Sequence, residues 1–105
     1  LEQPAFAMEL CRKEATKMAE LSKKAIYIAL DNVGKYREED YHRVCEIEAA
    51  VDKYEDALGS YLVKLNNKDL SPRDSRSVSV ILHCINDFER ISDHARNIAE
   101  EVLGK

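Results

Sequence analysis

The scarcity of helix-breaking residues constrains the fold of this chain more than any other feature. Its 105 residues include only three glycines and two prolines. No glycine or proline interrupts residues 5–33, and Ser71-Pro72 is typical of a helix start, with a capping hydroxyl followed by proline at the first helical position. The sequence therefore predicts three long helices, with breaks at residues 34–38 and 67–71 and a last helix that ends near Leu103.

Apolar residues recur with helical spacing in all three segments. The second segment has the most regular stripe, in which steps of three and four residues alternate as in a heptad repeat. The residues expected to face inward are Ala7, Leu10, Cys11, Met18, Leu21, Ala25 and Ile28, then Val44, Ile47, Val51, Tyr54, Leu58, Tyr61 and Leu65, then Val78, Ile81, Ile85, Phe88, Ala95, Ile98 and Val102. Because short connections make successive helices antiparallel, we expect an all-α, three-helix up-down-up bundle of the spectrin-repeat kind. Gly34, helped by Asn32, is expected to end the first helix in left-handed geometry.

Composition and charge exclude several classes of protein. Hydrophobic residues make up 45% of the chain and charged residues 34%, as in a globular domain. A net charge of −4 leaves no basic patch for a nucleic acid. The cysteines Cys11, Cys45 and Cys84 lack zinc-ligand spacing, which favours free thiols in a reducing compartment. No membrane span or secretory signal is visible, and a start without methionine indicates a piece of a larger protein.

Catalytic motifs are missing, so we predict that the chain is not an enzyme. It has neither a GxSxG elbow nor a glycine-rich phosphate loop. His42, His83 and His94 are widely separated and have no obvious serine or cysteine partner.

Two columns of acidic residues are more informative. In each column the spacing is four residues, which places side chains one above another on a helix. The columns are Glu48, Asp52 and Asp56 in the second segment and Glu89, Asp93 and Asn97 in the third. If the second turn is centred near Asp69, Glu48 and Asp52 stand at about the height of Glu89 and Asp93.

Facing columns of this kind predict a metal site between the second and third helices. Rows of hard oxygen donors suit divalent or trivalent ions such as iron or zinc. The alternative is a solvated face, on which Lys53 and Arg90 form ordinary surface ion pairs. Like charges stacked at a spacing of four residues are mildly destabilising without a cation, and this favours the metal site.

Glu14 interrupts the apolar stripe of the first segment, between Cys11 and Met18. A carboxylate at such a position must reach solvent, find a partner or bind a cation.

The run Asp87-Phe-Glu-Arg-Ile-Ser-Asp-His-Ala-Arg-Asn-Ile98 resembles the signature helix of the PhoU family. Glu48 and Asp52 are similar to the other acidic motif of that family, as is the Leu70-Ser-Pro-Arg-Asp74 start of the third segment. The resemblance implies a single PhoU-like domain over residues 1–105, with a regulatory role in phosphate uptake and with metal clusters on the acidic motifs. Asn97 replaces a carboxylate of the family pattern.

Full-length PhoU proteins have two such repeats, whereas this chain has one. Single repeats occur as the cytoplasmic C-terminal part of bacterial sodium-phosphate cotransporters, and the Pro4-to-Met18 region resembles the segment after their membrane part. The resemblance thus implies a regulatory domain at the cytoplasmic face of the inner membrane. Its partner would be the membrane portion of the same chain or a phosphate-signalling protein.

Three further expectations remain open at this point. One alternative function is a stand-alone helical interaction module, or a PhoU-type regulator without metal. Another is a ferritin-type oxidase, which requires Glu-x-x-His on core-facing positions, a pattern that neither acidic column contains. A homodimer is also expected, because Leu30, Val63 and Leu82 lie off the main apolar stripes.

Overall fold

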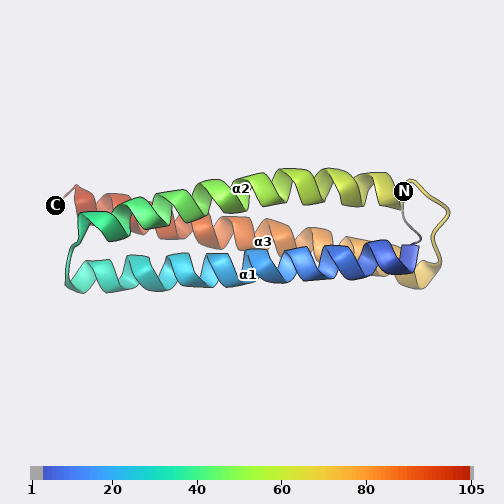
Figure 1. Ribbon diagram of the computed structural model, residues 1–105, viewed down its shortest axis with the longest axis horizontal. Helices are drawn as coiled ribbons and strands as arrows, with labels where there is room; N and C mark the ends of the chain where they lie inside the picture. Colours follow the sequence, from blue (N-terminus) through green and yellow to red (C-terminus); the bar gives the residue numbers. More distant parts are fainter. Residues whose placement is uncertain (1–3, 105) are drawn as a thin grey trace.

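The computed structural model describes residues 4–104, which form three helices: α1 (Pro4–Gly34), α2 (Glu38–Asn66) and α3 (Pro72–Leu103). They lie side by side in a bundle of 53 × 18 × 16 Å (Figure 1). The α1–α2 turn is at one end of the bundle and the α2–α3 turn is at the other. No strand occurs among the described residues, and the predicted three-helix up-down-up fold is confirmed. Residues 1–3 and 105 of the predicted domain lie outside the described part.

The start of α3 matches its prediction, whereas the end of α1 does not. The Ser71 hydroxyl accepts a hydrogen bond of 3.1 Å from the backbone N–H of Asp74, and proline follows at the first helical position. At the end of α1 neither Asn32 nor Gly34 has a positive φ, so the predicted left-handed ending is wrong. Asn32 is instead helical and buried, and its Oδ1 accepts a hydrogen bond of 2.7 Å from the backbone N–H of Arg37. This bond fixes the turn into α2.

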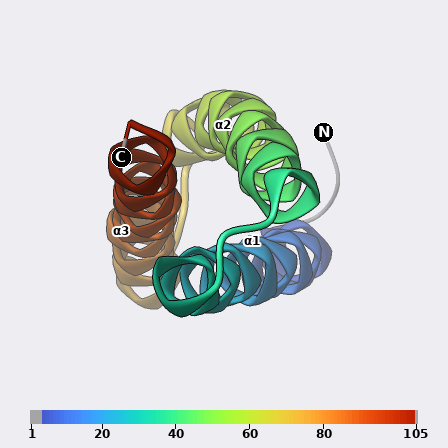
Figure 2. The same ribbon diagram turned by 90° about the vertical axis from the view of Figure 1, so that its left-hand side faces the viewer.

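The three helices surround the interior of the bundle, and every pair of them is in contact (Figure 2). The apolar interior consists of two clusters. The larger one lies toward the α2–α3 turn and includes Met18, Val51, Leu62 and Ile85. The smaller one lies toward the α1–α2 turn and consists of Ala25, Ala29, Val44, Ala95 and Ala99. Its alanines allow the helix backbones to approach closely.

Most of the expected core residues are buried or half-buried, with one exception. Leu10 was expected to face inward, but it is 39% exposed. The inward positions on this part of α1 are taken by Ala7, Cys11 and Ala15, which recur every four residues. Leu10 is therefore left at the edge of the apolar stripe.

Two buried serines lie along their helices between the residues of the two clusters. The Ser22 hydroxyl of α1 donates a hydrogen bond of 2.8 Å to the backbone carbonyl of Phe88 in α3. The Ser92 hydroxyl donates one of 2.9 Å to the carbonyl of Glu89. The Ser22 bond joins α1 to the segment of α3 that carries the second acidic column, whereas the Ser92 bond lies within α3.

Candidate metal centre

The pairing of α2 with α3 brings members of the two acidic columns together. One carboxylate oxygen each from Glu48, Glu89 and Asp93 lie within 4.8 Å of one another. A second group, with oxygens at the same spacing, consists of Asp52, Glu55 and Glu89. Glu89 belongs to both groups, so the two triads form one acidic cluster, called the acidic cluster below.

The second triad includes Glu55, which was not predicted as a metal ligand because it does not fit the four-residue spacing of the columns. Glu55 lies seven residues after Glu48, and at 3.6 residues per turn this interval returns the side chain to the same face of α2. Asp56 joins neither triad among the described residues and lies beside Glu55 on the groove between α2 and α3. Asn97 is exposed, one turn beyond Asp93. A search for heptad spacing as well as for steps of four would have found Glu55.

Arg96 is the basic residue that contacts the acidic cluster. Its Nη1 lies 3.0 Å from Glu48 Oε1, and its Nε lies 3.2 Å from Glu100 Oε2. The Glu48 side chain is only 13% exposed, so its ion pair with Arg96 is partly shielded from solvent. Arg90 forms an exposed surface ion pair of 3.5 Å with Asp87 in the preceding turn, of the kind expected from the sequence for a solvated face.

Burial and the negative charge that accumulates in the cluster raise the pKa of two of its members, Glu89 and Glu55. Burial raises the pKa of Glu89, and the neighbouring carboxylates of Asp93, Glu55, Asp52 and Glu48 raise it further. The pKa of Glu55 is raised by burial and by Asp52 and Asp56. In the metal-free protein these ionised carboxylates therefore oppose folding at neutral pH.

In the metal-free protein, the substitution Glu89→Gln should change the free energy of unfolding by an amount that depends on pH. A raised folded-state pKa gives a stabilising contribution that is complete below the unfolded pKa, about 4.3 for glutamate, and that is lost as pH rises through the folded pKa. The variant should therefore exceed the wild type in free energy of unfolding at pH 7, and the difference should shrink toward pH 4. Urea titrations at several pH values in the presence of a chelator measure it. A difference that did not change with pH would contradict the assigned pKa shift.

Other candidate residues lie outside the cluster. Glu14 is half-buried on α1, and its carboxylate pairs with Lys17 Nζ at 3.1 Å, so it has found a local partner. The three histidines are exposed, and the three cysteines are free. A Glu-x-x-His spacing does occur from Glu39 to His42, but both residues are exposed at the start of α2 and do not suit a ferritin-type centre.

The donor set of the acidic cluster fits a hard or borderline cation. Both triads offer only carboxylate oxygens, the ligands preferred by hard divalent and trivalent ions. The repulsion among these carboxylates is what such an ion would relieve. Neither triad contains a thiolate or an imidazole.

No helix of the described residues is both long enough and apolar enough to cross a membrane. Among known protein families, the one described as PhoU domain has a model that matches residues 15–102. The matched stretch contains both acidic columns and all of α2. No curated protein and no solved structure matches the chain.

Proposed function

We propose, from the premise that this chain belongs to the PhoU family, that it regulates a sodium-dependent phosphate transporter through a metal-binding acidic cluster. The family consists of regulatory domains without catalytic activity, so membership itself supports a role in the regulation of phosphate transport. The transporter partner and the metal are the further parts of the proposal. The metal is supported chiefly by the convergence of Glu48, Glu89 and Asp93, which belong to the two acidic motifs that resemble those of the family. The transporter partner is supported by the resemblance of the Pro4-to-Met18 region to the segment that follows the membrane part of such transporters.

The acidic cluster offers two adjacent positions for ions. Glu48, Glu89 and Asp93 would hold one ion, and Asp52 and Glu55 would hold a second that shares Glu89 with the first. A bound ion such as iron or zinc would supply positive charge between α2 and α3. The carboxylates from the two helices would then hold these helices together at mid-length, where Ser22 already ties α1 to α3.

The partner in this proposal is the membrane portion of a transporter at the cytoplasmic face of the inner membrane. Ion binding would change the charge of the α2–α3 face from strongly negative toward neutral. A change of this kind alters which surfaces can dock on that face, and so provides a means of restraining transport.

Uptake of labelled phosphate by cells tests the regulatory role. The gene that encodes the chain is changed to carry Asp52→Asn with Asp93→Asn, and uptake is measured before and after a pulse of phosphate, in sodium or in choline medium. We expect wild-type cells to reduce uptake after the pulse and the variant to continue, with the difference confined to sodium medium. Equal uptake by the two strains would contradict regulation through the acidic cluster, and an equal difference in choline medium would contradict the sodium-dependent partner.

A homodimer remains part of the proposal, although its expected surface is divided. Leu30 is exposed near the end of α1, close to the α1–α2 turn, and Val63 is exposed near the end of α2, close to the α2–α3 turn. Leu82 is half-buried and packs against the larger core cluster. These three residues do not form one continuous patch, so a dimer would use one end of the bundle or the other.

A further inference from the structure

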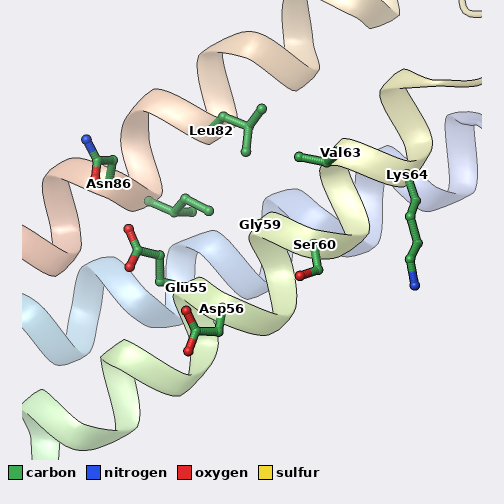
Figure 3. Close-up of a pocket in the computed structure, with 9 residues that line it drawn as sticks. Glu55, Asp56, Gly59, Ser60, Val63, Lys64, Leu82 and Asn86 are labelled. Carbon is green, nitrogen blue, oxygen red and sulfur yellow. The ribbon is translucent and has the colours of Figure 1, made fainter.

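A groove of about 610 Å³ lies between α2 and α3, next to the acidic cluster on the side of the α2–α3 turn (Figure 3). Its apolar lining comes from the side chains of Val63, Leu82 and Ile85. Glu55 and Asp56 form its acidic end. Val63 is 53% exposed and Leu82 is half-buried, so these two side chains are open to solvent, whereas Ile85 is only 2% exposed.

The groove contains a glycine that the fold does not require. Gly59 lies within α2, where glycine costs about 1 kcal/mol relative to alanine. Its φ is not positive, and the nearest atom that an added Cβ would meet is Ile85 Cδ1 at 3.9 Å, an ordinary contact. Helix packing therefore gives no reason for the missing side chain, and its absence keeps the groove open.

The charges around the groove define what it can accept. Glu55 and Asp56 lie together at one end, and Glu55 also belongs to the triad with Asp52 and Glu89. Lys64 lines the other end, but its side chain points away from α3 (Figure 3). A complementary partner needs an apolar surface for Val63 and Leu82 and a positive charge for the acidic end.

We propose that this groove binds a basic amphipathic helix. The nine-residue interval from Glu55 to Lys64 corresponds to about 14 Å, or about two and a half helical turns. A helix of that length places apolar residues spaced by three and four over Val63, Leu82 and Ile85. A lysine or arginine at one end then lies beside Glu55 and Asp56.

Fluorescence anisotropy with two synthetic peptides tests the proposal. Both are helical, about 14 residues long, with leucines spaced by three and four; one carries arginines at one end and the other carries glutamates there. The metal-free 105-residue chain should bind the arginine peptide about tenfold more tightly than the glutamate peptide. The preference should weaken as salt is added. Equal affinity for the two peptides would overturn the proposal.

Substitutions at Gly59 locate the binding site. Gly59→Leu fills the groove and should weaken binding of the arginine peptide about tenfold, whereas Gly59→Ala removes the same glycine with little added volume and should preserve binding. Circular dichroism checks that both variants are folded. Unchanged affinity in folded Gly59→Leu would overturn the proposal.

A variant with altered charge tests the proposal even if Gly59→Leu does not fold. Glu55→Gln with Asp56→Asn should remove most of the preference for the arginine peptide. Glu46→Gln, which removes an exposed carboxylate of α2 outside the groove, should leave that preference intact. Equal effects of the two changes would show a nonspecific attraction to the acidic chain, and the proposal would fail even if the metal site proved correct.

Discussion

Manganese or iron(II) is expected to raise the melting temperature of the wild-type chain, and the double substitution Asp52→Asn with Asp93→Asn is expected to abolish that rise. A ligand that binds only the folded state adds about 2.7 kcal/mol of stability at about 100 times its Kd. For a domain of this size, that is a shift of about 10 °C or more. The double substitution removes one carboxylate from each triad but also relieves repulsion, so the metal-free variant should remain folded. Differential scanning calorimetry across a range of ion concentrations measures the effect.

Single substitutions test whether the ion is bound by the residues of the triads or by the residues spaced four apart in the columns. Glu55→Gln should reduce the metal-dependent shift, because Glu55 is a triad member, whereas Asp56→Asn should leave most of it. Glu14→Gln on α1 serves as the control and should change stability without changing metal affinity. A double variant that kept the full shift would mean that the acidic cluster is only a solvated face.

The second large effect concerns the core and is expected for Leu62→Ala. Leu62 has no exposed surface and belongs to the larger core cluster, so its truncation should lower the free energy of unfolding by about 2–5 kcal/mol. Val63→Ala is the matched control, because the neighbouring valine is more than half exposed and should cost well under 1 kcal/mol. Urea denaturation of the two variants distinguishes them. Equal losses would mean that α2 is rotated about its axis relative to the arrangement described here.

Leu62 also shows which parts of the fold the sequence predicts and which it does not. Local signals located the helices: Ser71-Pro72 starts α3, and acidic residues open α2. The heptad stripe identified one line of core positions on α2, but each helix of a three-helix bundle contacts two neighbours and therefore buries a wider face. Leu62, which follows Tyr61 of the stripe, faces inward for that reason.

The acidic cluster shows the same division between local and tertiary information. Counting residues from the turn was enough to place Glu48 and Asp52 beside Glu89 and Asp93, because straight antiparallel helices preserve height. The partners of these residues were less accessible. The pairing of Arg96 with Glu48 and the burial of Ser22 and Ser92 depend on the rotation of each helix, which spacing alone does not fix.

The position of Glu55 has a consequence for how the two proposed ligands would affect each other. The same carboxylate completes a triad with Asp52 and Glu89 and forms the acidic end of the groove. An ion held there would neutralise the negative charge that attracts a basic helix. Each ligand would therefore lower the affinity of the chain for the other. Thermodynamic reciprocity requires the factor to be the same in both directions: however many-fold the ion weakens the helix, the helix weakens the ion equally. Through this one shared side chain, a rise in ion concentration would release the bound helix, and binding of the helix would release the ion.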